Sequence, residues 1–190
     1  HYRLFYLLSM YTGCRRGELS ALKWSDFTYI NNGLLLTISR SRSSVPDKGV
    51  VEGTPKNGKS REIYLSSELC GILRSYQRRK KIEADKRRRK LSPYLFTDEH
   101  GQLIHPDTFT KRLRKIYESI GFPREYHLHT LRHYYVTSLL HCGVDKQTVA
   151  DLVGHADTGF LERTYCHPQS EQKVQAASSM LTMLRPDGGQ

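Results

Sequence analysis

The run Leu34-Leu35-Leu36-Thr37-Ile38 lies between stretches whose apolar residues recur at helical spacing. Its continuous apolar character and its bulky side chains are typical of a buried strand. A second run, Glu62-Ile63-Tyr64-Leu65, alternates polar and apolar residues, as half-buried strands do. We expect residues 34–65 to form a small antiparallel sheet with a long connection, in which Asn57-Gly58 is a strong turn dipeptide.

Helical patterns lie on both sides of this sheet. Glycine follows the last apolar residue of several of them, as is common at helix ends, and Pro106 occupies a favoured first helical position. A short strand is expected at Tyr94-Leu95-Phe96. The sequence therefore predicts an α+β fold that is mainly α-helical, with a small antiparallel sheet near the N-terminal third. The expected helices cover residues 4–11, 16–22, a segment that begins after Ser66 or Ser67, and then residues 106–120, 130–140, 146–153 and 171–184.

Size and charge narrow the function classes. A chain of 190 residues suits one domain, or one domain with a tail, and 37% hydrophobic residues exclude wholesale disorder. No run of about 18 apolar residues predicts a transmembrane helix. The net charge of +11 and the pI near 9.6 are typical of nucleic-acid binders, although a ribosome-like packing role or a membrane-surface patch shares this signature. An RNA-binding module of the RRM type would need aromatic stacking motifs that this chain lacks.

Two further features have alternative interpretations. Nine of the thirteen residues from Arg78 to Lys90 are Lys or Arg, which fits a solvated helix face or a phosphate-contacting surface. The four cysteines are Cys14, Cys70, Cys142 and Cys166, and none forms a CxxC pair. Their spacing argues against a zinc finger and against a disulfide framework, so we expect reduced thiols in a cytosol.

The densest polar cluster is His127-Leu128-His129-Thr130-Leu131-Arg132-His133. His129 and Arg132 are three residues apart and therefore share a helix face. Taken alone, the cluster is a polar helix start or part of a site, and it lacks a nearby carboxylate or cysteine that would complete a zinc site. Tyr165 lies just before Pro168, outside any regular apolar stripe, which is unusual for a core tyrosine.

Several short boxes occur together in a distinctive order. They are Thr12-Gly13-Cys14-Arg15-Arg16-Gly17-Glu18-Leu19, Thr54-Pro55-Lys56, His129 to His133, Leu152-Val153-Gly154-His155, and Thr164-Tyr165-Cys166-His167. In this order they resemble the TGxRxGEL, hairpin-lysine, HxLRH, LGH and TYxH boxes of the tyrosine recombinases, also called the phage integrase family. The LGH box has one departure, because Val153 stands where leucine is usual. The resemblance extends from Leu4 to Pro168.

The resemblance implies a role for each matched residue. Arg15 and Arg132 are the arginines that hold the scissile phosphate, and Arg15 is preferred to Arg16 because it matches the TGxR position. Lys56 is the hairpin lysine and the candidate acid for the leaving oxygen. His129 and His155 are the two histidines, Tyr165 is the nucleophile, and Glu18 is an acidic residue that orients the arginine region.

The implied activity is site-specific DNA recombination through a covalent 3′-phosphotyrosyl link, without a cofactor or a metal ion. Preorganised guanidinium charge suits the anionic transition state, and a tyrosine with a reference pKa near 10 needs nearby cations or a base to attack. Rival interpretations are a type IB topoisomerase, which shares the chemistry, and a DNA-binding protein that has lost catalysis. A topoisomerase would relax supercoiled DNA without strand exchange. A DNA-binding protein without catalysis would form no covalent adduct.

The resemblance also implies a domain organisation and partners. We expect a catalytic domain over residues 1–168, a tail over residues 169–190 with a protomer-docking helix, and an upstream core-binding domain outside this fragment. The expected partners are double-stranded DNA at attachment or recombination sites, other protomers in a tetrameric synapse, and accessory DNA-bending proteins, with no membrane. The expected setting is the bacterial cytoplasm at the nucleoid, for a phage or another mobile element.

Overall fold

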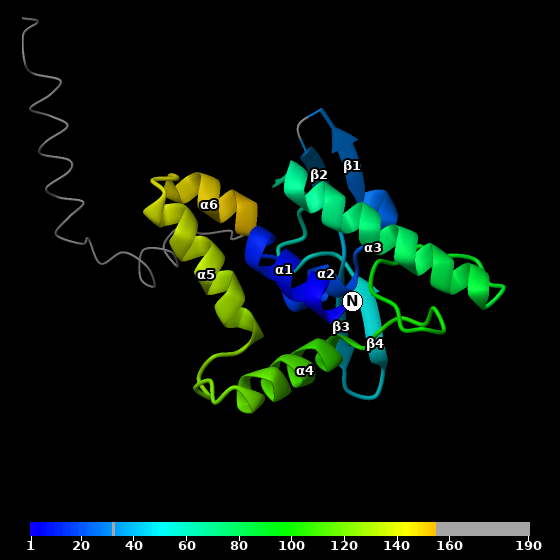
Figure 1. Cartoon of the computed structure of the whole chain (residues 1–190). Coiled ribbons are helices and arrows are strands. Elements are labelled where there is room, and N and C mark those ends of the chain that lie inside the picture. The colour runs from blue at the N-terminus through cyan, green and yellow to red at the C-terminus, as the bar shows by residue number, and fades with distance from the viewer. Residues whose placement is uncertain (32, 155–190) are drawn as a thin grey trace, which may run out of the picture. The chain divides into compact units, whose positions relative to one another are not determined.

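The computed structural model describes residues 1–31 and 33–154. His155, Tyr165 and the helix expected over residues 171–184 lie outside these residues. None of the helices in the described part is long and apolar enough to cross a membrane. The elements, shown in Figure 1, are α1 Tyr2–Thr12, α2 Arg16–Ser20, the 3-10 helix η1 Trp24–Asp26, β1 Phe27–Ile30, β2 Gly33–Ile38, β3 Ser41–Val45, β4 Gly49–Gly53, β5 Arg61–Ser66, α3 Ser67–Lys86, α4 Pro106–Ser119, α5 Leu128–His141 and α6 Lys146–Val153.

The expected antiparallel sheet is present and has three strands. β2 pairs with β5, so that Leu34 lies opposite Leu65 and Leu36 opposite Ile63. β1 pairs with the other edge of β2, which gives the strand order β1-β2-β5. The apolar residues of β2 and β5 that share one face are buried, because α3 packs against these two strands. The α+β prediction is therefore confirmed.

The connection between the two predicted strands is more structured than we expected. It contains a separate antiparallel hairpin of β3 and β4, in which Val45 pairs with Gly49. The turn at Asn57-Gly58 exists, since the Gly58 amide donates to the Pro55 carbonyl oxygen at 2.8 Å, but the strands on either side of it do not pair with each other. The placement of Lys56 at a hairpin tip was therefore wrong. The β3–β4 hairpin is held by backbone bonds between mostly polar residues, which hydropathy does not reveal.

The expected helices correspond closely to those observed. α1 ends at Gly13, whose φ of 59° is left-handed, α4 has Pro106 at its first position, and α6 has the predicted bounds. α2 ends at Ser20, two residues earlier than expected. Residues 94–96 do not form a strand, because their pairing is limited to an isolated bridge between Lys23 and Tyr94.

An aromatic cluster joins α1 to α4 in the centre of the core. The ring of Phe5 is fully buried and stacks on Phe109 with centroids 3.7 Å apart and planes 8° apart. Phe96 meets the Phe5 ring edge-on at 5.1 Å. α5 packs along α1, α6 packs on α5, and Figure 1 shows this pair on the opposite side of α1 from α3. The first turn of α5 thereby comes to lie near the loop between α1 and α2.

Close packing also places α2 against the β3 strand. A Cβ atom at Gly17 would lie 2.6 Å from the Arg42 carbonyl oxygen, which is far inside normal contact distance. Only a residue without a side chain permits this approach. The approach places Glu18, whose side chain is fully buried, next to the start of β5.

Candidate active site

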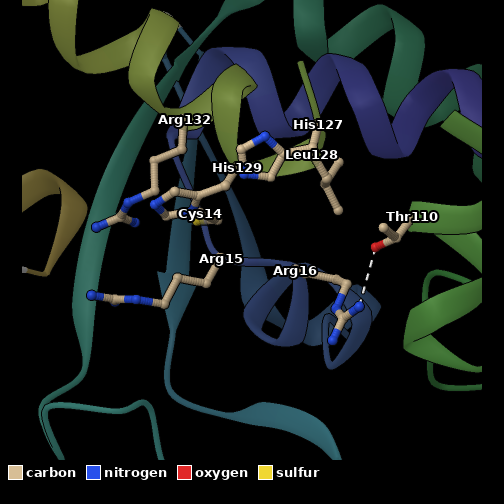
Figure 2. A pocket seen from close by; sticks show the side chains of 8 residues that line it. All are labelled: Cys14, Arg15, Arg16, Thr110, His127, Leu128, His129 and Arg132. Atoms are coloured by element: carbon tan, nitrogen blue, oxygen red, sulfur yellow. Dashed lines mark hydrogen bonds between the residues drawn. The ribbon is translucent and has the colours of Figure 1, made fainter. Parts of the chain in front are cut away.

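An open pocket lies between the α1–α2 loop, α4 and the first turns of α5, and Figure 2 shows its lining side chains. The lining is rich in nitrogen donors. Most of these side chains can donate hydrogen bonds, and the arginines among them are positively charged. The lining residues are Cys14, Arg15, Arg16, Thr110, His127, Leu128, His129 and Arg132.

Arg132 is a buried cation in this pocket, with an exposed fraction of 3%. Its Nη1 donates to the Gly13 carbonyl oxygen at 2.5 Å, and its Nη2 donates to the Val153 carbonyl oxygen at 2.7 Å. Among the described residues, no carboxylate forms an ion pair with it. Burial, followed by the positive charge of Arg15, lowers the pKa of Arg132 to about 10. A cation that is held by carbonyl dipoles in this way favours the arrival of an anion.

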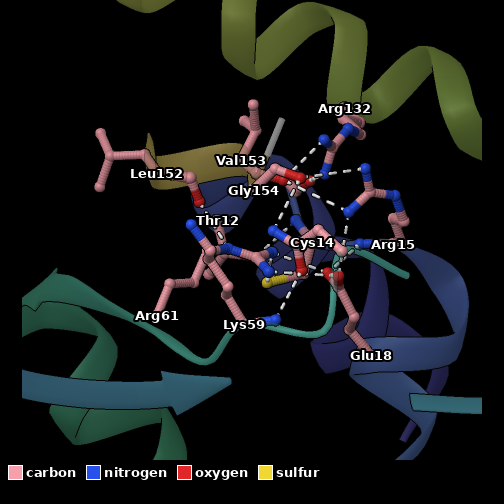
Figure 3. A network of polar contacts seen from close by, with 12 residues as sticks. Thr12, Cys14, Arg15, Glu18, Lys59, Arg61, Arg132, Leu152, Val153 and Gly154 are labelled. Atoms are coloured by element: carbon pink, nitrogen blue, oxygen red, sulfur yellow. Dashed lines mark hydrogen bonds and ion pairs between the residues drawn. The ribbon is translucent and has the colours of Figure 1, made fainter. Parts of the chain in front are cut away.

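Arg15, at the start of α2, shares the Val153 carbonyl group with Arg132 and also reaches that of Gly154. Its Nη2 donates to the Gly154 oxygen at 3.3 Å and its Nη1 to the Val153 oxygen at 3.5 Å, as Figure 3 shows. Its other partner is Glu18, which accepts from the Arg15 backbone N–H at 2.8 Å and from Nη1 at 3.1 Å. Arg15 and Arg132 therefore converge on the C-terminal end of α6.

The neighbouring Arg16 faces another part of the pocket. Its Nη1 lies 2.6 Å from Asp107 Oδ1 and donates to Thr110 Oγ1 at 3.1 Å, both on α4. Figure 2 shows the two guanidinium groups turned in different directions. Arg16 therefore has a carboxylate partner outside the group formed by Arg15, Glu18 and Arg132.

His129, in the first turn of α5, lines the same pocket as Arg15 and Arg132. Partial burial, and then the charges of His133, Arg132, His127 and Arg15, lower the pKa of His129 to about 4. The His129 ring meets that of His133 edge-on, with centroids 4.8 Å apart. At neutral pH the His129 imidazole is therefore uncharged, and it offers one donor and one acceptor nitrogen.

Glu18 is the buried acidic centre of the polar network. Burial opposes its ionisation, but hydrogen bonds and charges from Arg61 and Arg15 hold the pKa of Glu18 below its ordinary value. It accepts from Arg61 Nη2 at 2.7 Å and Nη1 at 3.2 Å. The carboxylate thus holds Arg15 by its backbone N–H and by its side chain.

Lys56 is not brought into contact with the arginines. It is exposed and follows Pro55 in the turn between β4 and β5. The next residue, Asn57, does approach the site, because its Nδ2 donates to the Gly154 carbonyl oxygen at 3.4 Å. The structure therefore brings together Arg15, Glu18, His129 and Arg132 and leaves the Lys56 side chain in solvent nearby.

The described residues contain no group of three or more His, Cys, Asp or Glu side chains suited to a metal ion. Cys14 lies in the pocket wall, and burial raises the pKa of its thiol to about 11, which leaves it protonated at neutral pH. The pocket is suited to an anion, because the guanidinium groups of Arg15, Arg16 and Arg132 line it together with the neutral imidazole of His129.

The profile of the phage integrase family matches residues 1–172. The chain belongs to the phage integrase family. A tyrosine recombinase XerC-like protein of Caldanaerobacter subterraneus is 29% identical over 94% of this chain and 48% of its own length. Tyrosine recombinase XerD of Listeria monocytogenes is 32% identical over 77% of this chain and 43% of its own length. This integrase-family chain thus spans about half the length of these curated relatives.

Solved structures share the fold. The Tn1549 transposon integrase in complex with transposon right-end DNA superposes with a TM-score of 0.76 at 16% identity, over 93% of this chain and 57% of that one. The XerA recombinase gives a TM-score of 0.61 at 25% identity, over 97% and 59%. The integrase-like catalytic fold expected from the boxes is therefore confirmed.

Sequence reasoning did not find every polar residue of this integrase-family site. It missed Arg61, which joins Glu18 to the end of α6. A signal was present, because Arg61 is in phase with Ile63 and Leu65, both of which face the core along β5. A charged residue on the buried face of a strand requires a buried partner.

Proposed function

We propose that this chain is the catalytic part of a site-specific DNA recombinase, which cleaves and rejoins DNA strands through a covalent 3′-phosphotyrosyl intermediate. The observation that carries the proposal is the convergence of Arg15 and Arg132 in one open pocket, where Arg132 has only carbonyl partners among the described residues. A DNA phosphodiester is an anion that could bind there. Guanidinium groups bind its two non-bridging oxygens with charged, directional hydrogen bonds.

In the proposed reaction, Tyr165 Oη attacks the scissile phosphorus while the bond from phosphorus to the 5′ oxygen breaks. The leaving 5′ oxygen takes a proton from Lys56, and the phenol proton passes to a base at the site. The 5′-hydroxyl of a partner strand then attacks the phosphotyrosyl bond and restores Tyr165. Each step exchanges one phosphodiester for another, so the reaction requires no external energy source.

The neighbouring groups have supporting roles in this scheme. Glu18 holds Arg15 through its backbone and side chain. His129 is neutral before DNA binds, and we assign it a hydrogen bond to the phosphate or to the nucleophile. His155 follows Gly154 in the sequence, and we assign it the second histidine role. Because the bound phosphate is negative, it stabilises positive charge on both arginines.

We propose the domain organisation expected from the boxes: a catalytic domain over residues 1–168 and a docking tail over residues 169–190, with a core-binding domain in the rest of a longer protein. The length of the curated relatives, about twice that of this chain, supports the last point. Deleting the residues after Pro168 should weaken cooperative assembly on DNA and leave the thermal unfolding of the remaining domain intact. Unfolding of the truncated chain would instead assign the tail to the domain core.

For its partners, we propose duplex DNA at a recombination site and other protomers in a tetrameric synapse. Two similar proteins support DNA and a second protomer as partners: the XerH site-specific recombinase was solved bound to its difH substrate, and a lambda integrase fragment was solved as a dimer on a core site. The Tn1549 integrase, solved with transposon DNA, supports integration or excision of a mobile element. The tetramer and the accessory DNA-bending proteins are proposed from the family resemblance alone. We place the reaction in the bacterial cytoplasm, at the nucleoid, because the similar curated proteins are bacterial recombinases.

The direct test traps the covalent intermediate. The 190-residue chain is incubated in EDTA with a pool of nicked suicide duplexes, and adducts are resolved on a denaturing gel. We expect an adduct in the wild-type chain, none in Tyr165→Phe, and a normal amount in Tyr134→Phe, a control at an exposed tyrosine of α5. Sequencing the captured DNA identifies the preferred site.

The same experiment separates the rival functions. Tight DNA binding with no adduct would identify a DNA-binding protein without catalysis. An adduct accompanied by relaxation of supercoiled DNA, with no strand exchange between two duplexes, would identify a type IB topoisomerase. An adduct that disappears in EDTA would contradict the metal-free reaction.

A further inference from the structure

Arg61 is a buried arginine that lies behind the pocket. It opens β5, and its side chain is 8% exposed. Its Nη2 and Nη1 donate to the two oxygens of Glu18, at 2.7 and 3.2 Å. Its Nε donates to the Leu152 carbonyl oxygen at 2.8 Å. One planar group therefore joins α2 to the last turn of α6, as Figure 3 shows.

The carboxylate that Arg61 holds also holds Arg15. Glu18 has no exposed side-chain surface, and its two oxygens accept four hydrogen bonds, two from each arginine. A buried carboxylate is stable only when its charge is balanced and its lone pairs are used. With Arg61 absent, Arg15 would be the remaining cation on Glu18. The Arg15 guanidinium would then be drawn toward the carboxylate and away from the Val153 and Gly154 carbonyl groups.

Arg61 also ends the loop that carries Lys56. Within this loop, Asn57 Oδ1 accepts from the Lys59 backbone N–H at 3.2 Å, and Asn57 Nδ2 donates to the Gly154 oxygen. Arg61 and Asn57 thus attach both sides of the loop to two backbone carbonyl groups at the end of α6, those of Leu152 and Gly154. A shift of the Arg61 side chain would therefore displace both the end of the Lys56 loop and the Glu18 carboxylate.

We infer that Arg61 is a positioning residue, which fixes Arg15 through Glu18 and fixes the Lys56 loop through the end of α6. This inference rests on the proposed function, because it assigns Arg15 and Lys56 to phosphoryl transfer. Arg61 itself does not contact the substrate. Its contribution is to hold two reacting groups, from segments more than 40 residues apart in the chain, in one arrangement.

The test compares Arg61→Met with a second buried arginine that has no part in the network. Arg42 is 7% exposed and donates to the carbonyl oxygens of Ser20 and Ile104. Arg42→Met therefore removes a buried guanidinium of the core without touching Glu18. Single-turnover adduct formation is measured at saturating DNA for both variants, at a temperature where both are fully folded. We expect Arg61→Met to be at least about 30-fold slower than wild type with unchanged DNA affinity, and Arg42→Met to stay within about threefold.

Two further variants separate positioning from general stability. Arg61→Lys keeps the charge but lacks the planar fork, so we expect it to recover only part of the rate. Glu18→Gln combined with Arg61→Met should be no slower than the slower single variant, because Arg61 acts through Glu18. Equal rates for Arg61→Met and Arg42→Met, or multiplying effects in the double variant, would overturn the inference.

A readout without DNA keeps this inference distinct from the proposed function. The carboxyl carbon of Glu18 is titrated by NMR in the wild type and in both methionine variants. In Arg61→Met, Glu18 stays buried but loses one of its two cationic partners, so its pKa should rise. In Arg42→Met the pKa of Glu18 should be unchanged. If the wild type forms no adduct, the proposed function fails, and this titration still decides whether Arg61 holds Glu18. An unchanged titration in Arg61→Met would overturn the positioning role.

Discussion

Arg15 and Arg16 are adjacent in the chain and differ in every contact. Arg15 joins Glu18 and the carbonyl groups at the end of α6, whereas Arg16 pairs with Asp107 on α4. The difference arises because Arg15 precedes α2 in extended backbone and Arg16 begins the helix. Consecutive side chains at such a junction point in different directions. A sequence box that contains two arginines therefore presents one of them to each side of the pocket.

This difference leads to a first prediction. Arg15→Ala should slow adduct formation by about 10²–10³-fold, the usual effect of removing one preorganised donor from a developing negative charge. Arg16→Ala should slow it by less than about tenfold, since its charge is already balanced by Asp107. Single-turnover rates on the same suicide substrate provide the measurement. Equal losses in the two variants would contradict the assignment of Arg15.

The histidine of the same pocket leads to a second prediction, on pH. The unfolded chain protonates His129 near pH 6.5, but the folded chain does so only near pH 4. Between these values the unfolded state binds more protons, so the free energy of unfolding falls as the pH falls through this window. Because the His129 side chain is only partly buried, solvent screens part of this effect, and we expect wild type to lose only about 1 kcal/mol more than His129→Gln between pH 7.5 and 5.

Urea unfolding at the two pH values measures this difference, and the ring protons of His129 report its titration directly by NMR. His129→Gln removes one titrating group, and the signals that disappear in this variant identify those of His129. An inflection for His129 near pH 6.5, in place of one near pH 4, would show that neither burial nor the neighbouring cations lower its pKa.

At the scale of elements, the contact between α2 and β3 holds the TGCRRGEL segment in place. Gly17 has no room for a side chain, because the Arg42 carbonyl oxygen and the Ser41 side chain occupy the space. Helical periodicity predicts α2 but not this contact. Hydropathy likewise misses β3, whose residues are mostly polar. β3 pairs with β4, and α2 packs against β3. Both contacts depend on backbone geometry, which a local sequence pattern does not predict.

A third prediction concerns this contact. Gly17→Ala should destabilise the fold by about 1–3 kcal/mol, as overpacking does, because the opposing atom belongs to the backbone and cannot rotate away. Gly71→Ala is the matched control, since Gly71 lies inside α3 and its Cβ would meet open space. That substitution should stabilise the fold by about 0.5–1 kcal/mol. Thermal and urea unfolding of the two variants would show opposite signs, and a stable Gly17→Ala would disprove the close approach.

At the scale of the whole molecule, the positive charge is unevenly distributed. In the basic stretch, Lys80 is buried and pairs with Glu83, and Arg87 pairs with Glu99. Among the described residues no carboxylate pairs with the exposed side chains of Lys81, Arg88 and Lys90. Lys81 in α3, and Arg88 and Lys90 just beyond it, share a surface with Asp85 and give it a net positive charge, which favours phosphate contact over a neutral solvated face.

The fourth prediction distinguishes these two interpretations by salt dependence. Each phosphate contact contributes about 0.9 to the slope of log affinity against log salt concentration. Neutralising all three cations as Lys81→Gln, Arg88→Gln and Lys90→Gln should reduce the slope by about 2–3 for duplex DNA. Arg87→Gln, at a cation already paired with Glu99, should leave it unchanged. An unchanged slope in the triple variant would identify this stretch as a solvated helix face.

The sequence alone determined the helices, the β2–β5 pairing and the order of the boxes. These features depend on neighbours in the chain: apolar spacing of 3.6 or 2 residues, a glycine after a helix, a proline at its start. Such patterns place Arg15, Glu18, His129 and Arg132 on the correct elements. They do not place Lys56 relative to the site, because the turn that carries it lies between strands that pair with other partners.

Only the tertiary structure decided how the site is held together. Arg15 binds carbonyl groups 138 and 139 positions further along the chain, and Arg61 joins Glu18 to Leu152. The carbonyl groups of Val153 and Gly154 are free to accept because a helix leaves its last carbonyls without internal partners. Every helix has such backbone carbonyl groups at its end, so the sequence does not indicate which of them will bind a side chain. Their use by two arginines follows from packing, which brings the end of α6 to the start of α2.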